Sequence, residues 1–397
     1  MPKSVKKIDV LIIGAGASGL MCAIEAGKRG RSVLVIDQAL KPGQKICLSG
    51  GGKCNFTNIQ ISSDHYISSN PHFCKSALKQ FSQWDFIHLL EKHRLLYEER
   101  NHGQLFCKES AKNLLDMLLT ECRGAHVLFL FNKAVICIEK LTGNQFKIMT
   151  TPNEIVCQSL VIATGGLSIP GAGASPFGYK IAEQFNIHVL PVRAGLVPFT
   201  LDPTDKKKLA PLSGIAVDAI VKVSKKQFRE NILFTHRGLS GPAILQASSY
   251  WQPGQKIIIN LLPDINLFDT LKNFQKNGSK KAIKSLLSNY LPKRLIHAII
   301  QKNMAERSLQ ETSLKELLLI CDTIHQWTII PCGTEGYRTA EVTLGGVDVN
   351  EISSKTMEAL SVKGLFFTGE VLDVTGRLGG YNLQWAWSSG WCAGQNV

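Results

Sequence analysis

The sequence contains neither a long apolar run nor a cysteine pattern typical of a metal site. No apolar stretch reaches the length of about 18 residues that a membrane-spanning helix requires, although 44% of the 397 residues are hydrophobic. The basic N-terminus, MPKSVKKIDV, leads directly into an apolar run, without a signal region or a cleavage site. We therefore expect a cytoplasmic globular protein, long enough for two or three hydrophobic cores.

The eleven cysteines include no CxxC pair and no Cys/His set with zinc spacing. We therefore expect no metal site, and we expect most of these thiols to be small buried apolar groups. Cys47 and Cys54 flank a glycine-rich segment and are candidates for a redox pair, although their spacing differs from that of flavin disulfide reductases.

The segment from Ile8 to Asp37 has the order of a dinucleotide-binding βαβ unit: an apolar run, GxGxxG, an Ala-rich helical stretch, a second apolar run and an acidic residue. Gly14 permits a tight turn, Gly16 lets the backbone approach a pyrophosphate, and Gly19 lets the helix pack closely. The helix N-terminus offers N–H groups to phosphates. Asp37 is placed to accept from a ribose hydroxyl. This unit alone does not distinguish NAD from FAD.

Two later segments predict a return of the chain to the same sheet. SLVIATGG, residues 159–166, is an apolar strand that ends in small residues. GLFFTGE, residues 364–370, is followed by GGYN and a helix from Leu383 to about Ala393. The T-G-[ED] ending is a flavin signature in which the acid accepts from the ribityl chain, and the next helix can point its N-terminus at the isoalloxazine. Together the three segments predict FAD, bound by a domain that both ends of the chain build.

The predicted fold is α/β, with a Rossmann-like FAD-binding domain interrupted by an insert. The first part of this domain is 1–191 and the second is 342–397, and the insert spans 192–341. Within the first part, 71–122 is predicted to be helical, and strands at 127–130, 134–138 and 146–150 to form a small antiparallel sheet. Within the insert, we expect a small β-barrel or sandwich over about 192–264 and a helical subdomain over about 265–325.

The net charge of +14 is concentrated in the insert, where 21 Lys and Arg face 12 Asp and Glu. Between Leu267 and Lys302 only Asp269 opposes the basic residues. This run has two interpretations, a solvated face or a surface that meets a polyanion such as RNA. The residues proposed for RNA contact are Lys272, Lys276, Lys280, Lys281, Lys284, Lys293 and Arg294.

Five motifs together resemble those of the YhiN/BaiN-type FAD flavoproteins: GAGASGL, SGGGKCNFTN, ATGG, FTHRGLSGPAIL and FTGEVLDVTGRLGGYNLQWAWSSG. Lys53 replaces the Arg that this family usually has before the cysteine. The resemblance implies FAD contacts at Gly14, Gly16, Ala17, Ser18, Gly19, Asp37, Lys45, Ser49, Gly50, Gly51, Gly52, Cys54, Asn55, Val135, Ala163, Thr164, Gly165, Gly166, Gly369, Glu370, Asp373, Gly379, Gly380, Tyr381, Asn382 and Leu383.

The family includes reductases of conjugated C=C bonds, an amine oxidase and enzymes that reduce uridine in large-subunit ribosomal RNA to dihydrouridine. The basic insert favours the last activity here, with FAD tightly bound and NAD(P)H as a transient electron donor. Reduction of uridine requires a proton donor at C5, for which Cys54, His236 and Tyr381 are candidates by residue type. His236 and Arg237 are equally compatible with an ordinary turn. The rival hypotheses are a small-molecule ene-reductase or amine oxidase, and a non-catalytic flavin-containing assembly or RNA-binding protein.

Overall fold

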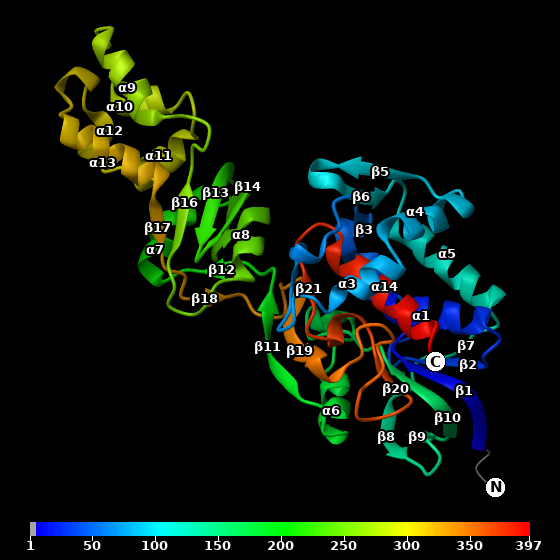
Figure 1. Cartoon of the computed structure of the whole chain (residues 1–397). Helices are drawn as coiled ribbons and strands as arrows, with labels where there is room; N and C mark the ends of the chain where they lie inside the picture. Colours follow the sequence, from blue (N-terminus) through cyan, green and yellow to red (C-terminus); the bar gives the residue numbers. More distant parts are fainter. Residues whose placement is uncertain (1–4) are drawn as a thin grey trace. The chain divides into compact units, whose positions relative to one another are not determined.

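The computed structural model describes residues 5–397 and divides them into two compact units. Unit 1 combines the chain up to Ala194 with Glu341–Val397, and unit 2 is Gly195–Ala340. In Figure 1 the blue N-terminal and red C-terminal segments lie together in unit 1. Both ends of the described chain therefore contribute to one body.

Unit 1 is organised around a seven-stranded sheet. Its parallel part contains, in spatial order, β7 (Leu128–Leu130), β2 (Val33–Ile36), β1 (Val5–Ile13), β10 (Glu154–Ile162) and β20 (Leu365–Phe367). β9 (Phe146–Thr150) pairs antiparallel with β10, and β8 (Val135–Lys140) pairs with β9. The apolar runs of β1, β2 and β20 are buried, as in parallel strands covered by helices on both faces.

Two helices from opposite ends of the chain pack against each other in this unit, α1 (Ala17–Lys28) and α14 (Tyr381–Gly394). A Cβ on Gly390 would lie 2.3 Å from the Ser18 carbonyl oxygen, and one on Gly394 would lie 2.8 Å from that of Cys22. The close contact of the two helices therefore requires glycine at both positions. Two shorter helices of unit 1 are α2 (Gln44–Leu48) and α6 (Phe177–Gln184).

The prediction that residues 71–122 are helical is only partly right. The helices are α3 (Cys74–Gln80), α4 (Gln83–Lys92) and α5 (Ala111–Gly124). Between α4 and α5, β5 (Tyr97–Arg100) and β6 (Gln104–Cys107) form a hairpin that pairs with β3 (Asn55–Asn58). The chain reverses at His102 and Gly103, which have φ values of 61° and 70°. This left-handed conformation is incompatible with the continuous helix that was predicted.

The small antiparallel sheet predicted at 127–150 is only partly right: β8 and β9 pair antiparallel, but all three strands belong to the main sheet. β7 pairs parallel with β2, and β8 and β9 extend the sheet beyond β10. Two small pairings complete unit 1: β4 (Tyr66–Ile67) with β21 (Thr375–Gly376), and β11 (Val189–Gly195) with β19 (Val342–Val347).

Unit 2 has a seven-stranded antiparallel sheet in the order β17-β16-β13-β14-β15-β12-β18. Within the described residues its end strands do not pair, so the sheet is open and not the closed barrel that the sequence suggested. The strands are β12 (Phe199–Thr200), β13 (Ala216–Val223), β14 (Lys226–Phe234), β15 (Gly238–Ser240), β16 (Ile257–Asn260), β17 (Trp327–Ile329) and β18 (Gly333–Thr334).

The helices of unit 2 share one hydrophobic core with this sheet. Short helices α7 (Pro203–Leu209) and α8 (Pro242–Ser248) lie in the first half of the unit. The helical part predicted from Leu267 onward consists of α9 (Leu267–Lys276), α10 (Ile283–Leu287), α11 (Lys293–Ile299), α12 (Lys302–Glu306) and α13 (Leu314–His325) (Figure 1).

Candidate functional site

Three glycine-containing segments meet at the carboxyl edge of the parallel sheet in unit 1. Backbone hydrogen bonds join the first residue after each strand to its neighbour: Gly14 N–H to the Ile36 carbonyl (2.8 Å), Ala163 N–H to that of Ile13 (2.9 Å) and Thr368 N–H to that of Ile162 (3.0 Å). Since ligands of open α/β sheets bind at this edge, we take it as the candidate site.

The first loop is closely packed on one side and open on the other. A Cβ on Gly14 would lie 2.3 Å from the Ala163 carbonyl oxygen, and the φ of Gly14 is +113°. By contrast, a Cβ on Gly16 would meet nothing within 4 Å. Gly14 is therefore required by the protein, whereas Gly16 faces space that a ligand can fill.

The N-terminus of α1 has no side-chain cap and no acidic residue in its first turn. Elsewhere in the chain, Asp202 caps α7 and Ser313 caps α13 through their side chains. The first N–H groups of α1 are thus left for an external anion, and α1 is long enough, at 12 residues, to present an appreciable dipole.

Asp37 stabilises the loop from the end of β2. Its Oδ2 accepts from the Ala15 N–H at 2.7 Å, and its Oδ1 accepts from the Ala39 N–H at 2.8 Å. Each carboxylate oxygen can accept a further hydrogen bond. The predicted bond to a ribose hydroxyl is therefore compatible with the two backbone bonds already present.

Glu370, which follows β20, is at the centre of a charged cluster. Its Oε2 accepts from Lys45 Nζ at 3.0 Å. Its Oε1 accepts from the Ser168 hydroxyl and from the Thr343 N–H, each at 2.9 Å. Burial alone would raise the pKa of Glu370, but the Lys45 ammonium and the hydrogen bonds from Ser168 and Thr343 bring that pKa below its ordinary value. Glu370 is therefore a carboxylate with three internal donors.

Sequence analysis missed Thr343 and Ser168. Thr343, at the start of β19, is almost fully buried, and its Oγ1 accepts from the N–H groups of Leu167 (2.8 Å) and Ser168 (3.2 Å). A Cβ on Gly166 would lie 2.5 Å from the same hydroxyl oxygen and 2.8 Å from Glu370 Oε1. Thr343 thus holds the segment after β10 against Glu370. No local pattern marks it, because its partners lie more than 170 residues earlier in the chain.

The predicted glycine loop, Ser49–Gly52, follows α2 and has left-handed φ values at Gly50, Gly51 and Gly52. A Cβ on Gly51 or Gly52 would meet nothing within 4 Å, so this loop also has an open side. Next to it, the Asn55 amide lies 3.1 Å from the Gly380 backbone nitrogen, at the N-terminus of α14. The loop and the start of α14 are therefore neighbours.

Some of the other residues predicted to contact FAD take part in hydrogen bonds within the protein. Asn382 accepts from the Gly376 N–H at 2.8 Å, and Asn58 donates to the Gly379 carbonyl at 2.9 Å. Burial raises the pKa of Asp373, although its Oδ2 accepts from the Ser69 N–H at 2.7 Å. Thr164 has a buried hydroxyl for which no partner is found among residues 5–397, and this hydroxyl lies against Gly178 of α6.

The three candidate proton donors differ in environment. Cys54 is fully buried, and an interaction with the Cys107 thiol, together with burial, raises its pKa well above the ordinary value. Tyr381 is the first residue of α14 and is buried, with its ring 5.0 Å from that of His65. His236 belongs to unit 2, where it is exposed in the turn between β14 and β15. Their roles remain predictions.

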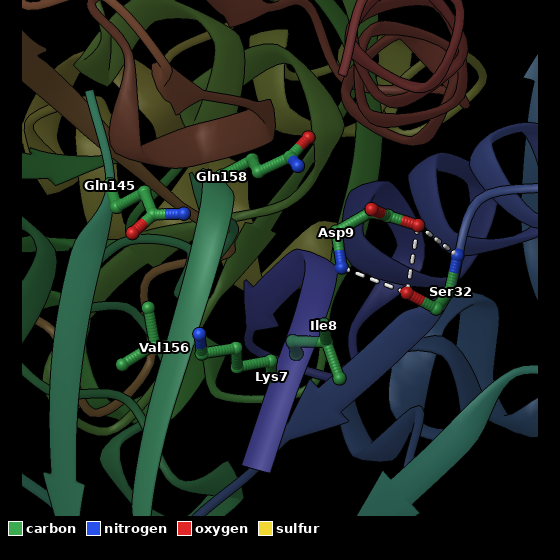
Figure 2. Close-up of a pocket in the computed structure, with 7 residues that line it drawn as sticks. All are labelled: Lys7, Ile8, Asp9, Ser32, Gln145, Val156 and Gln158. Atoms are coloured by element: carbon green, nitrogen blue, oxygen red, sulfur yellow. Dashed lines mark hydrogen bonds between the residues drawn. The ribbon is translucent and has the colours of Figure 1, made fainter. Parts of the chain in front are cut away.

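A surface pocket lies elsewhere in unit 1 and does not include the predicted residues (Figure 2). It is lined by Lys7, Ile8, Asp9, Ser32, Gln145, Val156 and Gln158. The Ser32 N–H and hydroxyl each donate to Asp9 Oδ2 at 2.8 Å. These residues precede or begin the apolar runs of the strands, whereas the glycine segments follow them, so this pocket is not part of the candidate site.

Neither a metal-ion site nor a membrane-spanning helix is found in the described part of the chain. No group of three or more His, Cys, Asp or Glu residues could hold a metal ion within residues 5–397. Over the same residues, no helix is both long and apolar enough to span a membrane.

The family model described as HI0933-like protein Rossmann domain matches residues 8–396. The chain belongs to this family. It is 53% identical to the ribosomal RNA dihydrouridine synthase of Escherichia coli (strain K12), over 99% of this chain and 98% of the relative. It is 47% identical to the protein of that name from Haemophilus influenzae, over 98% of each chain.

Two more distant similarities complete the comparison. A 3-dehydro-bile acid delta(4,6)-reductase of Clostridium scindens is 28% identical over 97% of both chains. Among solved structures, the 3-ketosteroid-delta4-(5alpha)-dehydrogenase of Rhodococcus jostii RHA1 aligns with a TM-score of 0.50 at 13% identity, over 99% of this chain and 98% of that one. The latter similarity concerns the fold alone.

Proposed function

We propose that this HI0933-like protein is an FAD-dependent oxidoreductase that uses NAD(P)H to reduce uridine in large-subunit ribosomal RNA to dihydrouridine. The observation that carries the proposal is the 53% identity to a ribosomal RNA dihydrouridine synthase over nearly the full length of both chains. Such a substrate places the protein with ribosomes in the cytoplasm.

The residues at the sheet edge fit FAD. Gly16 leaves open space in front of the uncapped N-terminus of α1, where a pyrophosphate would accept N–H groups. Asp37 retains acceptor positions for the adenosine ribose. At the other end, Lys45, the open loop Ser49–Gly52 and the N-terminus of α14 would contact the flavin half. Glu370 Oε2, with one internal donor, could also accept from the ribityl chain.

When bound, the flavin would supply the two-electron chemistry that connects NAD(P)H to the C5=C6 bond of uridine. The balanced reaction consumes NAD(P)H, one proton and uridine, and it yields NAD(P)⁺ and dihydrouridine. The chain must orient the base, exclude water and deliver a proton to C5. Cys54, Tyr381 and His236 are the candidates for the proton. The Lys45 ammonium and the positive end of α14 would stabilise negative charge on the bound cofactor.

The basic insert is proposed to contact the RNA. Three of the residues named for this role are engaged within unit 2: Lys272 donates to Gln275 (3.2 Å), Lys284 to Glu306 (2.9 Å) and Arg294 to the Pro211 carbonyl (3.2 Å). Lys276, Lys280, Lys281 and Lys293 are exposed and available for phosphates.

The test is a map of dihydrouridine in ribosomal RNA, by mass spectrometry, from cells with and without the gene. We expect one dihydrouridine to disappear on deletion and to return with the wild-type gene. It should return to a lower level with Gly16→Ala, whose methyl group would crowd the pyrophosphate space. Gly171→Ala is the matched control, since its Cβ also meets nothing within 4 Å but lies outside the three glycine segments.

The dihydrouridine map and a reduction assay on purified protein together separate the alternative functions. An unchanged map would refute the RNA substrate and favour a small-molecule ene-reductase or amine oxidase. A purified protein whose flavin absorption does not bleach anaerobically with NADPH or NADH would refute the oxidoreductase proposal as a whole and favour a non-catalytic assembly.

A further inference from the structure

Four lysines from three segments come together at one end of the sheet in unit 2. β13 and β14 form a hairpin in which Val223 pairs with Lys226 and Lys222 pairs with Gln227, so that Lys225 lies in the turn. β16 lies on the other side of β13 and pairs Ile258 with Lys222. Lys256, two residues before Ile258 and directly before β16 begins, is therefore opposite the hairpin turn. We name Lys222, Lys225, Lys226 and Lys256 the sheet-end lysines.

The sheet-end lysines lie on both faces of the hairpin. Lys226 is on the face of buried Val223, and its Nζ lies 5.6 Å from the ring centroid of half-buried Tyr250. Lys222 alternates with Val223 and points to the opposite face. All four side chains are exposed. From a strand separation of about 4.8 Å and a rise of about 3.3 Å per residue, their Cα atoms lie within about 10 Å of one another.

No carboxylate neutralises these four charges within the described residues. Residues 219–229 and 247–263 contain no Asp or Glu. The nearest acidic residues along the two hairpin strands are Asp218 and Glu230. Asp218 accepts from Arg229, as does Asp264 beyond β16, and Glu230 accepts from the Gln246 amide at 2.6 Å. Because the four Cα atoms lie within about 10 Å of one another, close to the Debye length of about 8 Å at physiological salt, the four charges create one local positive potential. A polyanion would be attracted to this potential.

The basic run on α9–α12 differs from this cluster at one position, because Lys284 pairs with Glu306 at 2.9 Å. Lys276, Lys280, Lys281 and Lys293 of that run are exposed, as the sheet-end lysines are. Sequence analysis identified this run because its residues are close in the chain. It missed the sheet-end lysines because strand pairing brings Lys256 to Lys222 from 34 positions away.

We infer that the sheet-end lysines and Tyr250 form a contact surface for the sugar-phosphate backbone of RNA, additional to the helical lysines. Cations on both faces of a narrow hairpin fit a partner that has phosphates on two sides, and Tyr250 supplies an aromatic surface beside them. This inference deepens the proposed function and rests on it.

The experiment compares three FAD-loaded proteins: wild type, K222Q/K225Q/K226Q/K256Q, and the control K75Q/K79Q/K355Q/K363Q. The control removes four exposed lysines from unit 1 and so changes the net charge equally. Binding to ribosomal RNA from deletion cells is measured against salt concentration. Each lost phosphate contact lowers the slope of log K against log salt by about 0.7–0.9. We expect the sheet-end variant to lose about 2–4 from the slope and at least tenfold in affinity, and the control to match wild type.

Substitution of the same four positions by arginine should restore binding, since the charge is kept. Melting temperature and FAD content show whether each variant is folded. A sheet-end variant that is folded and keeps the wild-type slope would overturn the inference. So would one that keeps RNA binding but loses binding to polyglutamate, since the surface would then fit an acidic protein. If wild type neither binds nor modifies ribosomal RNA, the proposed function itself fails, and the inference with it.

Discussion

Charged side chains at the two proposed binding surfaces differ in whether the protein itself supplies their partners. In unit 1 the Glu370 carboxylate has three donors, from Lys45, Ser168 and Thr343, and its side chain is only 21% exposed. In unit 2 the sheet-end lysines are exposed and have no carboxylate partner among the described residues. A partly buried charge must be compensated by the fold itself, whereas a surface charge can await an external partner. The first arrangement suits a small ligand held in one geometry, and the second suits a large polyanion.

A large effect on stability is expected from removal of the Lys45 ammonium. Lys45→Met leaves Glu370 with two neutral donors in a partly buried position, so the free energy of unfolding should fall by about 2 kcal/mol, less than for a fully buried pair. The double variant Lys45→Met/Glu370→Gln should recover part of this loss, because it also removes the uncompensated charge. Urea unfolding of FAD-free protein measures both. Glu370→Gln alone completes the cycle, and a loss in the double variant equal to the sum of the two single losses would show that the pair is not coupled.

Gly16→Ala tests the open side of the first loop. The added methyl group meets no protein atom within 4 Å, so the unfolding midpoint should stay unchanged. In the presence of FAD the methyl group would crowd the pyrophosphate and weaken binding by about 1–3 kcal/mol, which is roughly five- to 150-fold. Flavin fluorescence titration measures the affinity. Gly171→Ala is the control for both quantities, and wild-type FAD affinity in Gly16→Ala would contradict the proposed placement.

Thr343→Val tests the residue that sequence analysis missed. It keeps the shape of the side chain but removes the acceptor for the Leu167 and Ser168 N–H groups, at a cost of about 1–3 kcal/mol in unfolding free energy. Thr343→Ser retains the hydroxyl and should cost less. A Thr343→Val variant as stable as wild type, with Thr343→Ser less stable, would show that the methyl group matters and the hydroxyl does not.

The difference between the two units also explains what the sequence could predict. Each strand end of the site has a local signature, a run of buried apolar residues with a glycine within the next three positions, so Gly14, Ala163 and Gly369 could be assigned to one edge without coordinates. Thr343 and the sheet-end lysines have no such signature, since their partners are set by pairing between distant strands. Residues 97–107 were misassigned because an amphipathic pattern around them favoured a helix, whereas the hairpin depends on pairing with β3.

The stability of unit 1 should depend on pH through Glu370. Because the pKa of Glu370 is lower in the folded protein than its ordinary value, its contribution is present above the unfolded pKa of about 4.3 and is lost as pH falls through the folded pKa. Unfolding midpoints of wild type should therefore decline more steeply below about pH 4.5 than those of Glu370→Gln. Parallel declines in the two proteins would show that other carboxylates account for the acid sensitivity.

The smallest effect is expected at Lys284, which tests whether a surface ion pair in unit 2 contributes to stability as the Lys45–Glu370 pair does. Lys284 and Glu306 are 34% and 46% exposed, and the hydrogen bond from Lys284 lowers the pKa of Glu306. Water and salt screen such a pair, so Lys284→Gln should leave the unfolding midpoint within experimental error. Lys276→Gln, which removes an equally basic but unpaired side chain, is the control. A clear loss in Lys284→Gln alone would mean that unit 2 also uses its charges to hold its own fold, and that the basic run on α9–α12 is at least partly structural.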